Sequence, residues 1–293
     1  MAIDFFPPSE VYVGRDMGGR TTEVSAADVA RYEAGTGDRH PWYHGNSPFG
    51  GPIAPALLYH SEVYRDLGWY LPNLIGNLHA KQEWEVFAPM AIGQAVRTRS
   101  TVVGRYRKRN RDYVVNEVLL TDIDGRWLQR SRTHQSFLVD DPSDAVVVDK
   151  ERERRPERRF EISAQGDELP PVTRAVTVAM CEAFSGPVKN YHTDREMARA
   201  LGFPDIVVQG MLSICFVAEL MTHGFGTGWF CGGQLAVNLV NVLWPDEVVS
   251  TRGRVRDTVP EGRRARVHAD VWCEKADGTK TVIGTASALR DQN

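Results

Sequence analysis

Two turn motifs recur along the chain at a nearly constant spacing. Asp124-Gly125 and Asp277-Gly278 each stand where a hairpin turn is expected between two strand-like stretches, and they are 153 residues apart. The segment Phe49-Gly50-Gly51-Pro52-Ile53 aligns with Phe203-Pro204-Asp205-Ile206-Val207 at an offset of 154. Two landmarks that keep nearly one offset indicate that the same folding unit occurs twice.

The order of the expected elements is similar in the two halves. In the first half, Ser25 is a helix N-cap for a short helix that runs through Tyr32, and an apolar helix is expected from about Ile53 to Leu67. In the second half a short helix is expected at Asp194–Leu201, which the first half lacks, and an apolar helix from about Gly210 to His223. Each apolar helix precedes four expected strands, which are Asn77–Phe87, Ala95–Tyr106, Arg111–Asp122 and Arg126–Val139 in the first half and Gly233–Leu243, Val248–Val259, Ala265–Lys275 and Thr279–Leu289 in the second.

These patterns predict an α+β fold made of two similar domains. A helix that is apolar on nearly every face must be buried, and a curved antiparallel sheet can wrap around it. One such unit leaves an edge strand exposed, whereas two units side by side can pair those edges into one continuous sheet. The charged, proline-containing run Asp149–Arg159 is typical of a solvated linker, so the expected divisions are residues 1–145, 146–160 and 161–293.

Composition and charge exclude several classes of protein. The net charge of −3 gives no global attraction to nucleic acid or to an anionic membrane, and no apolar run is long enough to cross a bilayer. The N-terminal residues lack a basic segment followed by an apolar core, so no signal peptide is expected and the protein is predicted to be cytoplasmic. The four cysteines form no C-x-x-C pair and no Gly-x-Gly-x-x-Gly or P-loop occurs, so neither a structural metal nor a nucleotide cofactor is expected.

The loop before the second apolar helix carries the most specific pattern in the chain. It contains Gly186, His192 and the run Asp194-x-Glu196-x-Ala198, and the segment Gly202-Phe203 to Gly210 follows. This spacing resembles the motif of MaoC-like and hydratase-2-like proteins, which reads roughly G-D-x-N-P-x-H, then a short helix, then G-F-x-x-x-I-x-H-G. The resemblance covers most of the chain. It implies a tandem, or double, hotdog fold, in which each half wraps an antiparallel sheet around one long central helix.

The resemblance also implies roles for individual residues. In such proteins an Asp and a His manage the two proton transfers of hydration, and amides at the start of the long helix polarise a thioester carbonyl. His192 would then be the catalytic acid or base, and the amides of Gly210 and Met211 would bind the carbonyl oxygen. Glycine at position 210 would let the substrate approach the backbone closely. The other substrate-binding candidates in this half are Asn190, Tyr191 and Gln209.

Both halves depart from the family motif. In the second half the Asp position is Pro187, which has no titratable group. The first half keeps Asp38 at that position, but Tyr43 stands at the His position and His44 follows it. Asp38 is therefore a second catalytic candidate, and Tyr43 and His44 are candidates for shaping the acyl pocket. Each half's loop is expected near the end of the opposite half's helix, so that one pocket combines both halves.

Structural roles for the same residues stay open. His192 fits a hydrogen-bonded histidine before a buried helix, Asp38 fits a turn residue that caps local amides, and Tyr43 fits a packing residue with its hydroxyl satisfied nearby. The basic run Arg105–Arg111 fits a solvated hairpin tip, or a contact for the phosphates of coenzyme A or for an acidic carrier protein.

The resemblance implies a hydro-lyase that acts on an enoyl or 3-hydroxyacyl thioester, carried by coenzyme A or by an acyl carrier protein. The reaction would need no metal and no organic cofactor. Because Pro187 replaces the usual Asp, two other functions stay open: a non-catalytic accessory subunit that binds acyl thioesters, and a divergent hotdog thioesterase or lyase. A homodimer is compatible with these readings, since hotdog units usually associate through their sheets.

Overall fold

A single antiparallel sheet runs through the whole molecule. The computed structural model describes residues 11–67, 78–108, 111–138 and 160–291. Within them, ten strands lie in the order β1-β3-β4-β5-β2-β7-β10-β9-β8-β6. The strands are β1 (Asp16–Glu23), β2 (Leu78–Val86), β3 (Ala95–Lys108), β4 (Arg111–Asp122), β5 (Trp127–Leu138), β6 (Glu168–Ala175), β7 (Gln234–Leu239), β8 (Val248–Glu261), β9 (Arg264–Lys275) and β10 (Lys280–Asp291).

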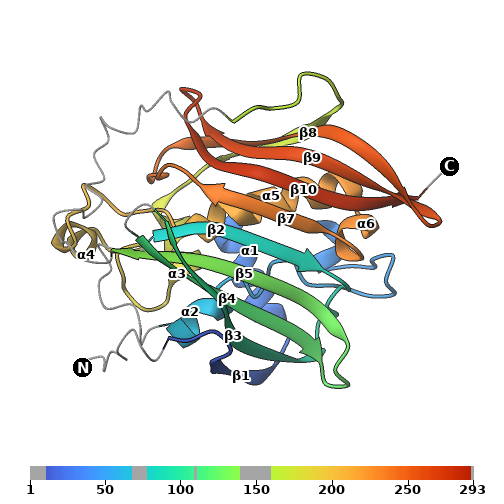
Figure 1. Cartoon of the computed structure of the whole chain (residues 1–293), viewed down its shortest axis with the longest axis horizontal. Coiled ribbons are helices and arrows are strands. Elements are labelled where there is room, and N and C mark those ends of the chain that lie inside the picture. Colours follow the sequence, from blue (N-terminus) through green and yellow to red (C-terminus); the bar gives the residue numbers. More distant parts are fainter. Residues whose placement is uncertain (1–10, 68–77, 109–110, 139–159, 292–293) are drawn as a thin grey trace.

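The strand order confirms that one unit occurs twice. The first half contributes β1-β3-β4-β5-β2, and the second half contributes its equivalents in reverse across the middle, β7-β10-β9-β8-β6. The two halves meet where β2 pairs antiparallel with β7, with Trp84 opposite Leu235 (Figure 1). The two inner edges that isolated halves would expose are therefore paired with each other, as the sequence predicts.

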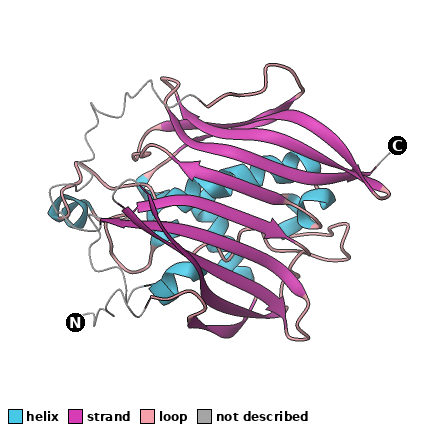
Figure 2. Cartoon of the chain, viewed as in Figure 1, coloured by secondary structure: helices cyan, strands magenta, loops and turns pink. Residues whose placement is uncertain are grey.

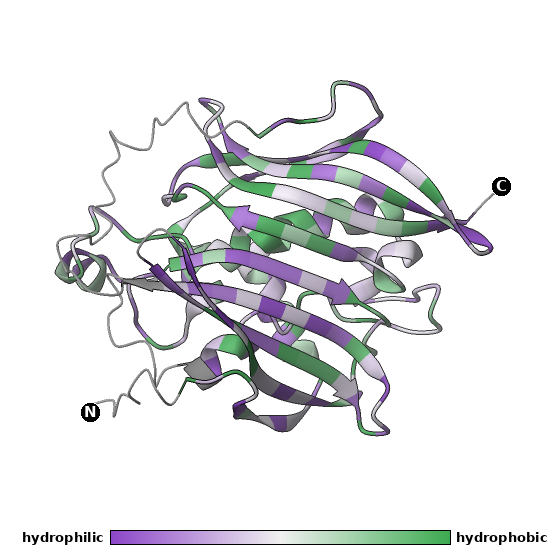
Figure 3. Ribbon diagram, viewed as in Figure 1, coloured by the Kyte–Doolittle hydropathy of each residue, from purple (hydrophilic) through white to green (hydrophobic). Residues whose placement is uncertain are grey.

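The helices lie mainly behind the sheet in the view of Figure 2, on its inner side. The longest is α5, which contacts β6, β8, β9 and β10 and is buried from Met211 to Thr222. Its apolar character on all faces explains this position, which Figure 3 shows as a mostly green helix behind the sheet. The helices are α1 (Ala26–Thr36), the 3₁₀ turn η2 (Pro41–Tyr43), α2 (Glu62–Leu67), α3 (Val178–Ser185), α4 (Arg195–Ala200), α5 (Gly210–Phe225) and α6 (Thr227–Phe230).

The helix predicted from Ile53 to Leu67 is only partly present, which corrects the expectation of one long central helix in each half. Only α2 is α-helical within that range. The amide of Ile53 donates to Trp42 O at 2.9 Å and that of Ala54 donates to Met90 O at 2.8 Å, so the segment begins tied to its neighbours. Pro52 and Pro55 offer no amide hydrogen, and a series of turns then follows up to α2.

Other expectations are confirmed more closely. Ser25 caps α1 by accepting from Asp28 N, and Asp194 caps α4 in the same way. Gly125 and Gly278 both adopt a positive φ, 87° and 83°, at the two equivalent hairpins. Almost all of the predicted linker, residues 146–160, lies outside the described residues. Among the described helices, none is both long and apolar enough to cross a membrane.

The close pairing of β10 with β7 at Gly284 leads to a prediction about the stability of the protein. A Cβ on Gly284 would lie 2.2 Å from Ala236 O and 2.6 Å from Val237 Cα, both backbone atoms of β7. We expect Gly284→Ala to lower the free energy of unfolding by about 1–3 kcal/mol, because the two strands must separate to admit the methyl group. Gly51→Ala, where nothing lies within 4 Å, is the matched control. Thermal unfolding of the two variants measures the difference, and equal midpoints would contradict the prediction.

Candidate functional site

The loop that carries His192 is built around Asn190. The Asn190 side-chain amide donates to Ser185 O at 3.0 Å and to Val188 O at 2.9 Å, and its Oδ1 accepts from His192 N at 2.8 Å. The amides of Thr193 and Asp194 both donate to Asn190 O at 2.9 Å. Asn190 thus holds the loop that places His192, which leaves its side-chain amide engaged in the loop itself.

His192 is a neutral imidazole with one nitrogen left as an acceptor. Its Nδ1 lies 2.7 Å from Val207 O, and because a carbonyl only accepts, Nδ1 carries the proton and Nε2 does not. Burial lowers the pKa of His192 to about 4, although the bond to Val207 opposes that shift. The ring of Tyr191 lies 3.9 Å away and itself stacks on Phe203. The imidazole of His192 is therefore held in one orientation and is uncharged at neutral pH.

The start of α5 lies next to this loop. Gln209 is the N-cap residue but gives no side-chain hydrogen bond to the helix; instead its Oε1 accepts from the Ser185 hydroxyl at 3.2 Å. The first amides of a helix have no partner within it, and the helix dipole makes this end positive. The amides of Gly210 and Met211 are accordingly suited to bind a carbonyl oxygen that gains negative charge.

Glycine at position 210 packs against the sheet. A Cβ there would lie 2.0 Å from Leu239 Cδ2 on β7, so the space beside the backbone is filled by a side chain of the sheet. Packing of α5 against the Leu239 side chain is therefore one reason for glycine at position 210.

First-half residues reach the same end of α5. Nδ1 of His79, on β2, lies 3.8 Å from the Cβ position at Gly210. His79 also lies 3.1 Å from the Tyr64 hydroxyl through Nδ1 and 3.1 Å from Gln82 Oε1 through Nε2. Burial lowers the pKa of His79 to about 4. No local motif marks His79 in the sequence, because it joins this site only through the pairing of β2 with β7.

Asp38 lies in a second cluster, around the other end of α5. The Tyr43 hydroxyl donates to Asp38 Oδ2 at 2.7 Å, while Oδ1 has no hydrogen-bond partner among the described residues. Both residues are buried. Burial raises the pKa of Asp38, even though the bond from Tyr43 and the nearby charge of Arg174 act in the opposite direction.

Glu219 and His223, one turn apart on α5, complete this cluster. Arg174 on β6 donates to Glu219 Oε1 and, at 3.3 Å each, to the carbonyl oxygens of Thr36 and Gly37. Burial and the charge of Asp38 raise the pKa of Glu219 to about 7, against the effect of Arg174. The sequence did not predict Arg174, Glu219 or His223 as site residues, since neither a motif nor a spacing connects them with Asp38.

Solved structures with a similar fold cover nearly the whole chain. A MaoC-like dehydratase superposes with a TM-score of 0.72 at 17% identity, over 97% of this chain and 99% of the other. A MaoC-like dehydratase from Phytophthora capsici superposes with a TM-score of 0.69 at 16% identity, over 98% and 100%. A conserved hypothetical protein of Mycobacterium tuberculosis, described as having a double hotdog fold, gives 0.65 at 12% identity, over the full length of both.

The fold is a double hotdog. No family model matches the sequence, and no curated protein matches it in sequence. At identities of 12–17%, the structural similarity establishes the fold alone. The activity must be argued from the residues of this chain.

The double hotdog places the predicted site residues in two groups. His192, Asn190, Tyr191, Gln209, Gly210 and Met211 gather at the start of α5. Asp38 and Tyr43 lie near Glu219, about 14 Å further along the helix at about 1.5 Å per residue. Asp38 therefore does not form a pair with His192. His44 lies on the surface, 2.6 Å from Glu33 Oε1. The first-half loop that carries Asp38 lies beside the second-half helix α5, as expected, whereas the second-half loop that carries His192 lies at the start of α5 in its own half.

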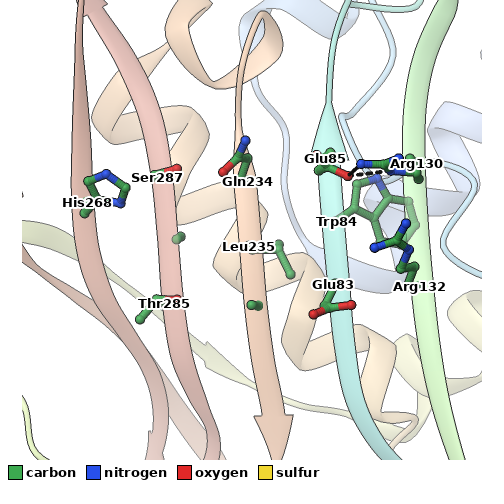
Figure 4. A pocket seen from close by; sticks show the side chains of 12 residues that line it. Glu83, Trp84, Glu85, Arg130, Arg132, Gln234, Leu235, His268, Thr285 and Ser287 are labelled. Carbon is green, nitrogen blue, oxygen red and sulfur yellow. Dashed lines mark hydrogen bonds and ion pairs between the residues drawn. The ribbon is translucent and has the colours of Figure 1, made fainter. Parts of the chain in front are cut away.

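A hollow on the outer face of the sheet is separate from both groups. Figure 4 shows it in front of the strands, with α5 behind them, lined by side chains of β2, β5, β7, β9 and β10. Its arginines are engaged in ion pairs, Arg130 with Glu85 and Arg132 with Glu117. None of the predicted site residues lines it, so the hollow is not the site to which the motif residues belong.

Proposed function

We propose that the chain is a hydro-lyase that adds water to a trans-2-enoyl thioester, or removes it from the 3-hydroxyacyl thioester. The observation that carries the proposal is the geometry of His192: a neutral imidazole with Nδ1 fixed by Val207 O lies just before the uncapped start of α5. The first provides a base and the second provides donors for the thioester oxygen. The likeness of the fold to MaoC-like dehydratases supports this reading.

A single base suffices for the proposed reaction. With the thioester oxygen on the amides of Gly210 and Met211, Nε2 of His192 takes a proton from water as the water oxygen bonds to C3. The C2–C3 double bond shifts toward the carbonyl, whose oxygen becomes an enolate. The imidazolium then returns the proton to C2 and the thioester carbonyl re-forms. This route needs no second acid or base, so the reaction can proceed although Pro187 occupies the position of the usual carboxylate.

The other predicted residues have supporting roles in this proposal. Asn190 fixes the loop, Tyr191 packs against the imidazole, and Gln209 joins the loop to α5 through Ser185. Tyr64 and His79 border the site from the first half. The acyl thioester is carried by coenzyme A or by an acyl carrier protein.

The test is hydration of crotonyl-CoA and of longer enoyl thioesters, followed by the loss of enone absorbance. We expect turnover, and in D₂O we expect one deuterium at C2 on the same face as the new hydroxyl, because one residue delivers both. Deuterium on the opposite face would assign the second proton transfer to another group and overturn the single-base mechanism. Lack of turnover with every chain length and with both carriers would overturn the function itself.

One observation favours the accessory-subunit reading as a second candidate. Among the described residues, no carboxylate hydrogen-bonds to His192, so the pair that such hydratases are expected to use is incomplete. This reading predicts saturable binding of acyl thioesters without turnover. Calorimetric titration with a saturated acyl-CoA, run beside the hydration assay, distinguishes the two functions.

A further inference from the structure

Three groups that commonly bind metal ions meet near the end of α5 that is remote from His192. One carboxylate oxygen of Asp38, one of Glu219 and one ring nitrogen of His223 lie within 4.8 Å of one another. Asp38 comes from the loop after α1 in the first half, and the other two lie on α5 in the second. The carboxylates are buried, at 2% and 3% exposed, whereas His223 is exposed.

The carboxylates of this cluster have oxygens without partners. Tyr43 donates to Oδ2 of Asp38, and Arg174 donates to Oε1 of Glu219. Oδ1 of Asp38 and Oε2 of Glu219 are both buried and have no hydrogen bond within the described part of the chain. A buried polar atom without a partner is costly, and a buried ionised one more so. Two such atoms in one cluster therefore point to a positively charged ligand.

We propose that Asp38, Glu219 and His223 bind one divalent transition-metal ion, with Zn²⁺ as the probe, and that the ion links the two halves of the protein. Ligand atoms about 2.0–2.2 Å from Zn²⁺ lie roughly 3.3–3.6 Å apart in a tetrahedron, so separations of up to 4.8 Å need only a small closure. Rotation of the exposed His223 side chain supplies it. One imidazole and two carboxylates are suitable ligands for such an ion, and three protein ligands leave a fourth position for water.

The surroundings of the cluster fit a metal centre. Tyr43 and Arg174 each bind one oxygen of the two carboxylates, as groups around a metal site often do, and the other oxygen of each carboxylate has no hydrogen-bond partner among the described residues. Arg174 neutralises only one of the two carboxylates, so the cluster stays negative when both are ionised. The sequence contains no ligand spacing for this site because Asp38 is about 180 residues from Glu219 in the chain.

The experiment is a titration of the full chain with Zn²⁺ after treatment with a chelator, followed by calorimetry and by metal analysis after dialysis. We expect one ion per chain and a higher thermal midpoint with metal, because an ion that binds only the folded state stabilises it. Asp38→Asn and Glu219→Gln should each weaken binding by at least about tenfold, the smallest loss expected even for an outer partner. With Co²⁺ in place of Zn²⁺, the spectrum should show no thiolate charge transfer, which excludes the cysteines as ligands.

The matched control is the pair Asp257→Asn and His268→Gln, which replaces an aspartate and a histidine that lie 3.9 Å apart on the sheet and are partly exposed. These variants should bind Zn²⁺ as the wild type does. The amides at 38 and 219 still accept from Tyr43 and Arg174, so circular dichroism and the metal-free midpoint should show that both variants fold. The proposal is overturned if the wild type binds no Zn²⁺, or if its binding survives unchanged in both Asp38→Asn and Glu219→Gln.

Discussion

His192→Ala is expected to lower kcat/KM for hydration of an enoyl thioester by about 10²–10⁴-fold, the range typical of general acid–base catalysis. The imidazole is placed by two backbone contacts, His192 N to Asn190 Oδ1 at 2.8 Å and Nδ1 to Val207 O at 2.7 Å. Removal of the ring takes away Nε2 but leaves the loop bond to Asn190. The loss should therefore appear mainly in kcat. Steady-state kinetics with crotonyl-CoA measures it, and turnover that survives the substitution would contradict the assignment.

The pH profile tests the protonation state assigned to His192. Because burial lowers the pKa of His192 to about 4, the neutral base is fully present well above that pH and is lost only as the pH falls toward it. The kcat/KM of the wild type should thus stay flat through neutral pH and show no decline near 6.5, the ordinary value for histidine. His44→Ala is the control, since His44 lies on the surface beside Glu33 and should retain full activity.

The sequence predicts the sheet well because its signals are local. Alternation of apolar residues and the Asp-Gly turns fixes eight of the strands to within a few residues, and Arg111–Asp122 agrees at both ends. The long apolar run from Gly210 likewise predicts α5, because a helix without a polar face must be buried. The internal offset then predicts that two such units pair their edges, and the β2–β7 contact has this form.

The strands that the sequence did not predict, and the helix that it predicted wrongly, lack such local signals. β1 and β6 lie at the two ends of the sheet, where exposure removes the alternation, and β6 contains Pro170 and Pro171, which an edge strand tolerates. Ile53–Leu67 is as apolar as a buried helix, but Pro55 and the contacts with Trp42 and Met90 hold its first part in turns. Tertiary contacts override the apolar pattern there.

The candidate site likewise has a part that the sequence predicts and a part that it does not. The motif placed His192 and the start of α5 together because they are close in sequence and joined through Val207. The position of Asp38 was not predictable from its motif, since α5 separates it from His192. Its actual neighbours, Glu219 and Arg174, come from a helix and a strand of the other half, and only the three-dimensional packing brings them together.

Arg174→Met is expected to lower the free energy of unfolding by about 3 kcal/mol at a pH well above 7, in the presence of a chelator. Glu219 is 3% exposed and pairs with Arg174, which also donates to the carbonyl oxygens of Thr36 and Gly37. Arg174 lowers the pKa of Glu219, so without the guanidinium that pKa rises above about 7 and the carboxylate is charged and unpaired beside Asp38 only at higher pH. The loss should shrink as the pH falls, because protonation of Glu219 removes the unpaired charge. Chemical or thermal unfolding at two pH values measures both effects.

A second substitution identifies the source of that loss. If the buried charge is responsible, Arg174→Met with Glu219→Gln should recover much of the stability, since a neutral amide needs no cation. If the contacts of Arg174 with Thr36 and Gly37 are responsible, the double variant should stay as unstable as the single one. Arg195→Met is the control, because its ion pair with Asp205 at 3.0 Å is exposed and should contribute less than about 1 kcal/mol. An Arg174→Met variant no less stable than this control would show that the pair with Glu219 does not hold the halves together.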